Sequence, residues 1–227
     1  MTIEGESAGA RGLSRRSFIR RAGVASAAAA VPAGLFVSEV ASAPERERLE
    51  TFSAAEADTI DAMLGRLAPN DATGPGAVEA RVLRYIDRAL SGDLASSRAA
   101  YTSGIGSTNA YARSRFGDDF ADLTPAQQDS ILDEMERNVA TGFSPSPRAF
   151  FDLVREHAVQ GLFGDPVHGG NADFVGWDLI GFTGVKLRYS EAEQQLDVGV
   201  VPAHKSAVDY PLWSGARGNG GNDGHRH

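Results

Sequence analysis

Cysteine is absent from the 227 residues of this chain. Disulfide bonds, thiolate zinc sites, iron–sulfur clusters and haem attached through a Cys-x-x-Cys-His motif are therefore excluded. The sequence also lacks a Gly-x-Gly-x-x-Gly fingerprint after a strand and a P-loop lysine motif. No motif indicates a bound nucleotide, and we expect the chain to hold no cofactor and no metal of its own.

Basic residues are outnumbered by acidic ones. The chain has 22 Lys and Arg against 30 Asp and Glu, which gives a net charge of −8 at pH 7. Residues 1–43 contain five Arg and three Glu, so the residues that follow carry a net charge of −10. This acidic balance disfavours nucleic acid and anionic membrane surfaces as partners, because both repel a negatively charged protein.

Long stretches of alternating apolar and polar residues are also missing, and only Leu187–Tyr189 and Val198–Val201 are candidate strands. Apolar residues instead recur at helical spacing behind capping signals such as Ser53-x-x-Glu56. The expected fold class is mainly α: a single helical domain with a Gly-rich loop pinned by aromatic residues and an extended C-terminal segment. We predict helices from Ser53 to Leu67, from Ala77 to Leu90, from Leu94 to Arg115, from Thr124 to Gly142 and from Ser146 to Gly161.

The N-terminus has the order of features that is typical of a twin-arginine signal peptide. Arg15 and Arg16 are followed by a polar residue and Phe18, and then by the Ala-rich stretch Ala22–Val40. That stretch is too weakly apolar for a stable membrane anchor. Ala43 ends an Ala-Ser-Ala cleavage pattern. These features predict export in a folded state to the periplasm by the twin-arginine translocase.

These patterns divide the chain into four parts. Residues 1–43 are predicted to be the signal peptide, 44–52 a charged linker, 53–213 the helical domain, and 214–227 a disordered tail rich in Gly, Asn and His. Proteins that are exported folded usually carry a cofactor or travel with a partner that carries one. Because this chain shows no cofactor motif, we expect it to act as the carrier of a partner.

Two glycine-rich stretches, Gly161–Asn171 and Gly176–Gly184, are unusual because they also contain bulky aromatic residues. The tripeptide Gly169–Asn171 permits a positive φ at consecutive positions, and Asp165 is predicted to brace this turn through backbone amides. A flexible linker would not need Trp177. We therefore predict a structured loop that is pinned by aromatic side chains.

These two stretches, with the helix predicted just before them, resemble the signature of the gluconate 2-dehydrogenase subunit 3 family. The resemblance is specific over Phe150–Gly184, whereas over Phe52–Val139 only the layout of capped helices is similar. Thr183 stands where proline is common in the family, and His168 stands where tyrosine is common. The chain is thus similar to the small, often exported subunits of flavin-dependent sugar and polyol dehydrogenases.

The resemblance implies a non-catalytic, accessory role. In the family, FAD and the catalytic residues lie in a separate large subunit that is similar to glucose–methanol–choline oxidoreductases, and a cytochrome c subunit often takes the electrons. The small subunit is thought to help the large one fold and to carry it through the twin-arginine pore. On this basis we expect FAD in the partner subunit, and a periplasmic location with membrane association through the complex.

A contact surface for the large subunit is predicted at the Gly-rich loop. Its aromatic residues have two interpretations at this point, as core residues of this chain or as anchors buried in the interface. We expect the segment between Leu187 and Trp213 to extend along the partner and to order on binding. The predicted interface residues are Phe163, Asp165, Pro166, His168, Gly169, Gly170, Asn171, Trp177 and Phe182.

Two other functions are compatible with the sequence. A stand-alone, metal-assisted enzyme would use His157, Asp165 and His168, although the two histidines are 11 positions apart instead of the three or four that are typical of zinc-binding helices. The other is a periplasmic helical binding module without an oxidoreductase partner. The simpler interpretation of His157 is a partly buried position on the apolar face that contains Phe150 and Val154.

Overall fold

The computed structural model describes residues 48–195, 199 and 201–214. The predicted signal peptide, with its arginine pair and cleavage site, lies outside the described residues, as does the predicted tail apart from its first residue. Every named element in the described ranges is helical, so the mainly α prediction is confirmed, and Leu187–Tyr189 is not a strand. The other candidate strand, Val198–Val201, lies partly outside the described residues. No helix within these ranges is long and apolar enough to cross a membrane.

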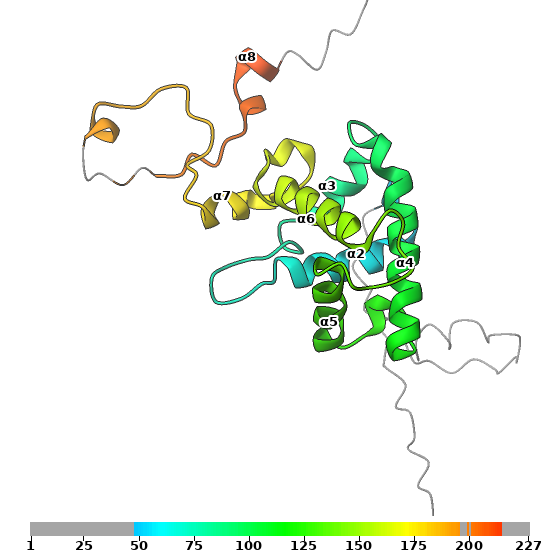
Figure 1. Cartoon of the computed structure of the whole chain (residues 1–227). Helices are drawn as coiled ribbons and strands as arrows, with labels where there is room; N and C mark the ends of the chain where they lie inside the picture. The colour runs from blue at the N-terminus through cyan, green and yellow to red at the C-terminus, as the bar shows by residue number, and fades with distance from the viewer. Residues whose placement is uncertain (1–47, 196–198, 200, 215–227) are drawn as a thin grey trace, which may run out of the picture. The chain divides into compact units, whose positions relative to one another are not determined.

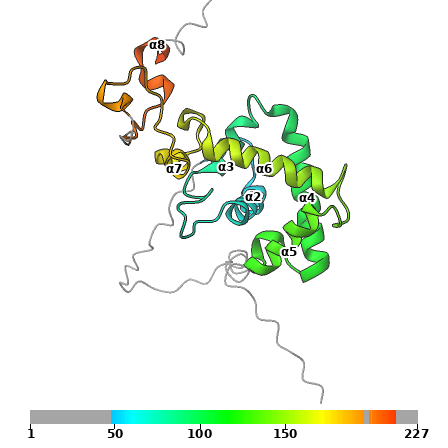
Figure 2. The same cartoon turned by 60° about the vertical axis from the view of Figure 1, so that its left-hand side comes forward.

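The core lies between α2 and α6. Helix α6 crosses the helical body (Figures 1 and 2) and contacts α2, α3, α4, α5 and α7. Helix α2 also contacts α3, α4 and α5. The helices are α2 (Ala54–Leu67), α3 (Val82–Ala89), α4 (Arg98–Phe116), α5 (Pro125–Glu136), α6 (Pro147–Phe163), α7 (Val175–Leu179) and α8 (Pro211–Ser214).

The predicted N-terminal caps are confirmed. Ser53 Oγ accepts a hydrogen bond from Glu56 N, and the Glu56 carboxylate accepts one from Ser53 N. Thr124 and Gln127 form the same reciprocal pair at the start of α5. Ser146 caps α6, again with proline at the first helical position. Each cap satisfies backbone amides that have no partner within the helix.

The second predicted helix is shorter than expected. Its prediction covers 77–90, but α3 spans only Val82–Ala89, because Arg81 is left-handed with a φ of 56°. Ala77 is nevertheless buried, in a turn where its amide donates to Ala68 O at 2.9 Å. The apolar spacing before Val82 therefore reflects a turn packed on the core and not a helix.

The fourth predicted helix ends early. The prediction reaches Gly142, but α5 stops at Glu136, and Asn138 is left-handed with a φ of 61°. The amide of Val139 then donates to Glu134 O at 2.9 Å, a bond typical of a left-handed C-terminal cap. As a result Val139 is 56% exposed and is not part of the buried face of α5, which contains Ile131, Leu132 and Met135.

Gly104 lies in the middle of α4, where glycine weakens a helical prediction. It is buried against α6, and a Cβ atom built on it would lie 2.2 Å from the ring of Phe150. Glycine at this position allows the two helices to approach closely. Tyr101, Ile105 and Ala112 are buried on the same helix. The third predicted helix is therefore confirmed, but it begins at Arg98, after the 3₁₀ turn Ala95–Ser97, and not at Leu94.

A buried carboxylate fastens the start of the described chain to α3. Asp87 is 1% exposed, and its oxygens accept hydrogen bonds from the amides of Glu50, Thr51 and Phe52 at 2.6, 2.9 and 2.8 Å. Thr51 Oγ1 donates to the carbonyl oxygen of Asp87 at 2.8 Å. The guanidinium of Arg98 lies over the ring of Phe52. The last residues of the predicted linker are therefore bound to the helical domain.

Candidate functional site

The Gly-rich loop follows α6 and folds back against it. A Cβ atom at Gly170 would lie 2.2 Å from Gly161 O, and one at Gly176 would lie 1.8 Å from Leu162 O. Both glycines are thus required because the two backbones touch. Gly169 has a φ of 101°, which confirms the predicted positive φ at this position. At Gly170 the structural reason for glycine is instead the close approach.

Asn171 ties the two ends of the loop together. Its side chain is fully buried, its Nδ2 donates to Gly164 O at 2.8 Å, and its Oδ1 accepts from Gly176 N at 2.8 Å. Asn171 is left-handed, with a φ of 45°, and so are Asp173 and Phe174. Non-glycine residues in this region cost conformational free energy. The two hydrogen bonds of Asn171 offset part of that cost and hold the loop in one conformation.

Trp177 pins the loop from inside. It is 4% exposed, and its indole N–H donates to Phe163 O at 2.9 Å. Its ring centroid lies 5.4 Å from that of Phe174 and 4.8 Å from that of Phe182. The prediction of a loop pinned by aromatic side chains is confirmed, and Trp177 packs within this chain.

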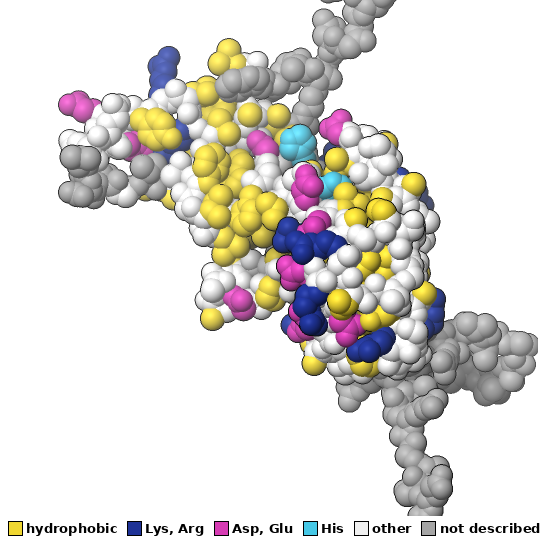
Figure 3. Space-filling view, in the orientation of Figure 1, with side chains coloured by type: hydrophobic (Ala, Val, Ile, Leu, Met, Phe, Trp, Pro, Cys, Tyr) yellow, Lys and Arg dark blue, Asp and Glu magenta, His cyan; other side chains and the backbone are white. Residues whose placement is uncertain are grey.

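The end of α7 exposes apolar side chains. Leu179, Ile180 and Phe182 are 37%, 59% and 43% exposed, and we call these three residues the α7 patch. Figure 3 shows hydrophobic side chains gathered around α7. The patch has a fixed position, because Phe182 N donates to Trp177 O at 2.8 Å and the Phe182 ring packs edge-on against Trp177. Apolar surface on such a rigid frame is typical of a protein contact.

Asp165 begins the turn that follows α6. Its Oδ1 accepts from Val167 N at 3.0 Å and caps the short 3₁₀ turn Pro166–His168. Its Oδ2 accepts from Ala207 N at 3.3 Å. The prediction that this carboxylate braces Gly169–Asn171 is wrong. One of its oxygens accepts from the preceding turn, at Val167, and the other accepts from the C-terminal segment, at Ala207.

The predicted interface residues occupy three kinds of position. The buried ones support the loop from within, and the half-buried and exposed ones can offer surface to a partner. The prediction did not include Leu179 and Ile180. Two consecutive apolar residues in a glycine-rich stretch were the sequence signal that could have indicated an exposed contact there. Buried are Gly170, Asn171 and Trp177; half-buried are Phe163, Asp165, Pro166 and Gly169; exposed are His168 and Phe182.

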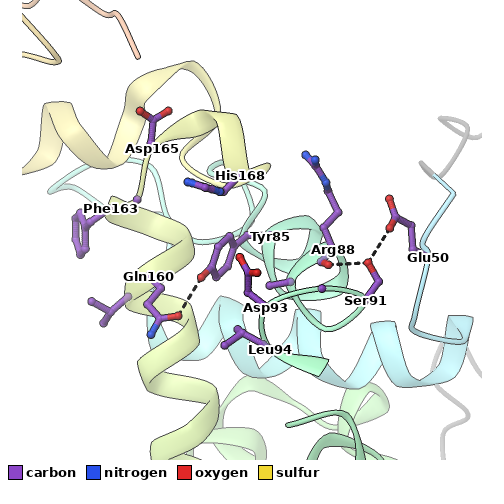
Figure 4. Close-up of a pocket in the computed structure, with 14 residues that line it drawn as sticks. Glu50, Tyr85, Arg88, Ser91, Asp93, Leu94, Gln160, Phe163, Asp165 and His168 are labelled. Carbon is purple, nitrogen blue, oxygen red and sulfur yellow. Dashed lines mark hydrogen bonds between the residues drawn. The ribbon is translucent and has the colours of Figure 1, made fainter. Parts of the chain in front are cut away.

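A polar groove of about 750 Å³ lies beside the loop, between α3 and the end of α6 (Figure 4). Tyr85 OH donates to Gln160 Oε1 at 2.9 Å. Burial, and then the charge of Asp93, raise the pKa of Tyr85. Asp165 and His168 also line the groove. Because the phenol stays protonated near neutral pH, the groove suits polar contacts better than acid–base chemistry.

His157 lies in the core of the helical domain. It is 4% exposed, its Nδ1 lies 3.1 Å from Tyr101 OH, and the two rings are stacked. In the part of the chain that the structure describes, no three His, Asp or Glu side chains come together as metal ligands. The buried position of His157 is therefore confirmed, whereas the metal-assisted enzyme built on His157, Asp165 and His168 is not supported.

We expect His157 to make the fold sensitive to acid. Burial lowers its pKa below the usual 6.5. Between the lowered pKa and 6.5 the unfolded chain binds more protons than the folded one, so the free energy of unfolding falls as the pH drops below about 6.5. Urea unfolding at a series of pH values between about 8 and about 5 measures this loss.

Two variants separate the contribution of His157 to this pH dependence from that of the other histidines. His157→Gln keeps a hydrogen-bond partner for Tyr101 but does not titrate, so we expect a flatter dependence of unfolding free energy on pH. His168→Gln changes an exposed histidine and should leave the dependence as in the wild type. Equal slopes for the wild type and His157→Gln would contradict the assignment.

Comparison with known families gives a match over most of the helical body. A family model described as gluconate 2-dehydrogenase subunit 3 matches residues 54–184, which is more than half of the 227 residues. The match begins with α2 and ends just after the α7 patch, so it includes the Gly-rich loop. No curated protein and no solved structure gives a significant match.

Proposed function

This chain belongs to the gluconate 2-dehydrogenase subunit 3 family, and we propose that it is the non-catalytic small subunit of a periplasmic, FAD-dependent sugar or polyol dehydrogenase. A chain of this family is a subunit of a dehydrogenase complex, so partner subunits are implied. In our proposal the partner is a large flavoprotein of the glucose–methanol–choline type, and a cytochrome c subunit takes the electrons.

The observation that carries the proposal is the α7 patch. Its three side chains are exposed in the isolated chain, although the loop beneath them is fixed by buried hydrogen bonds of Asn171 and Trp177. Burying a large apolar side chain contributes roughly 1.5–3 kcal/mol. Interfaces concentrate their binding energy in a few such anchors. The patch therefore supports docking of a second protein at this end of α7.

The proposed mechanism is binding to the folded, flavin-loaded large subunit. A partner that binds only the folded state stabilises it by mass action, by about 2.7 kcal/mol at 100 times the dissociation constant. Dinucleotide-binding folds require parallel strands, and the described ranges contain no strand. This supports assigning FAD to the large subunit, with the leader of the small subunit directing both through the twin-arginine translocase.

The docking step is tested by replacing Ile180 and Phe182 together with aspartate. We expect the large subunit to bind this variant at least about 100-fold more weakly, because each anchor costs about 2 kcal/mol or more when a charge takes its place. Affinity purification of the tagged chain measures this, with the absorbance of bound flavin reporting the large subunit.

Val139→Asp is the control, since it places one such charge on an apolar residue that is about as exposed as Ile180 and lies after α5, away from the α7 patch. Urea unfolding checks that both variants are folded; a modest loss of stability is expected for the Ile180/Phe182 variant only, because Phe182 packs on Trp177. If the Ile180/Phe182 variant still recovers the flavoprotein in full, the α7 patch is not part of the interface.

A further inference from the structure

Residues 185–214 lie beyond the range that the family model matches. We call their described part the C-terminal arm. Its two ends are held together by hydrogen bonds: Val185 N donates to Lys205 O at 2.9 Å, and Tyr210 OH donates to Val185 O at 2.6 Å. The arm therefore forms a closed loop with its own internal contacts.

Closure of the arm brings together the only two lysines of the chain, Lys186 and Lys205. With Arg188 they line a groove of about 590 Å³. Lys186 Nζ pairs with Glu193 at 2.6 Å, and this bond holds the pKa of Glu193 down to about 2. No carboxylate of the described ranges pairs with Arg188 or Lys205. The groove lining thus has a net charge of +2, although the chain is acidic.

Large apolar side chains are exposed on the same arm. Leu187 and Tyr189, which alternate with the basic residues, are 44% and 47% exposed, and Val201 and Leu212 are 74% and 76% exposed. The ammonium groups of the two lysines lie 5.6 and 5.5 Å from the ring centroids of Tyr189 and Tyr210. Figure 3 shows hydrophobic and basic side chains together on this part of the surface, at the upper left.

We propose that the C-terminal arm is a membrane-contact element that binds anionic lipid headgroups. Arg188 and Lys205 pair with headgroup phosphates, while Leu187 and Tyr189 enter the boundary between headgroups and acyl chains. Lysine stems and tyrosine rings suit this position because each joins an apolar body to a polar end. The arm also carries Glu191 and Asp209, but neither lines the groove. Charges more than about 8 Å from the groove are largely screened at physiological salt.

The distribution of the apolar residues favours lipid over a protein partner. They come from separate segments of the arm, 187–189, 201 and 212, and they flank a cationic groove. A protein would need a specific complementary surface with carboxylates at matching places. A lipid interface offers phosphates directly above a fluid apolar layer and accommodates any spacing. This inference does not depend on the proposed function, because it requires this chain alone.

A single fluorescent label tests the contact. Because the full chain has no cysteine, Ala192→Cys allows a polarity-sensitive dye to be placed on the exposed arm only, which separates its signal from that of the leader. We expect a blue shift with vesicles of equal parts phosphatidylglycerol and phosphatidylcholine, and little shift with phosphatidylcholine alone. The shift should weaken as salt is added.

Charge removal gives the quantitative test. Each basic residue near an anionic surface contributes about 1 kcal/mol. The double variant Arg188→Gln, Lys205→Gln should therefore need about 30-fold more lipid to reach half of the maximal dye shift. The matched control, Arg81→Gln with Arg88→Gln, removes two exposed charges, one just before α3 and one within it, and should behave as the wild type.

Three results would overturn the inference: no shift with phosphatidylglycerol vesicles, the same shift with phosphatidylcholine alone, or an unchanged lipid dependence in the Arg188/Lys205 variant. A label at Val139→Cys, on an exposed residue that follows α5, controls for adsorption of the whole chain and should not shift. A shift at both positions would indicate adsorption without a specific arm contact and would also overturn it.

Discussion

Replacing Arg15 and Arg16 by lysine is expected to retain the large flavoprotein subunit in the cytoplasm, although the charge of the leader is unchanged. Lysine carries a compact charge on a flexible stem, whereas the guanidinium presents a planar fork of donors. A receptor that recognises the arginine pair therefore loses its ligand. We expect periplasmic dehydrogenase activity to fall about tenfold or more, measured with a dye acceptor after cell fractionation.

The predicted signal peptide also supplies the control. Arg20→Lys with Arg21→Lys makes an identical chemical change outside the twin pair, and it should leave the periplasmic activity near the wild-type level. The cytoplasmic fraction of the Arg15/Arg16 variant should contain the missing large subunit. Wild-type amounts of that subunit in the periplasm would refute the proposed role as its carrier.

Asp87→Ala is expected to lower the free energy of unfolding by about 4 kcal/mol. The substitution removes a charged acceptor and leaves the amides of Glu50, Thr51 and Phe52 without their partner, the first two in a partly buried position and the third in a buried one. Hydrogen bonds to charged groups contribute about 1.5–3 kcal/mol each, and they are not additive. Because whole domains are stable by only about 5–15 kcal/mol, urea unfolding should show a large shift of the midpoint.

Two further variants calibrate this prediction. Asp87→Asn keeps one acceptor oxygen and should lose about half as much stability as Asp87→Ala. Asp118→Ala removes an exposed carboxylate and should change the unfolding free energy by less than about 0.5 kcal/mol. An Asp87→Ala protein within about 1 kcal/mol of the wild type would show that the N-terminal segment is not fastened by this side chain.

The helix starts that have a capping residue could be predicted from the sequence, and the reason is local. Ser53 and Thr124 cap their helices through residues three positions away, so the signal lies within one turn of sequence. Two of the missed boundaries, the start of α3 and the end of α5, depend on left-handed residues. Asn138 has some local tendency toward that conformation, but Arg81 has none, and only packing of the preceding turn against the core explains it.

The site was predicted in outline and not in detail. Glycine, asparagine and tryptophan in one stretch indicated a structured loop, which the structure contains. The sequence could not distinguish Gly169, which needs a positive φ, from Gly170, which lies against the backbone of α6. It also could not separate Trp177, buried in this chain, from Phe182, which is left exposed beside it.

The amino-acid sequence alone determined the lack of thiol chemistry, the helix caps, the resemblance to the family and the order of features in residues 1–43 that predicts a signal peptide. Each of these depends on composition or on residues close together in the chain. Only the tertiary structure decided that Asp87 is buried beneath the N-terminal segment, that the α7 patch is exposed, and that Lys186 and Lys205 share one groove. Burial and proximity between distant residues follow from packing, and packing is a property of the whole folded chain.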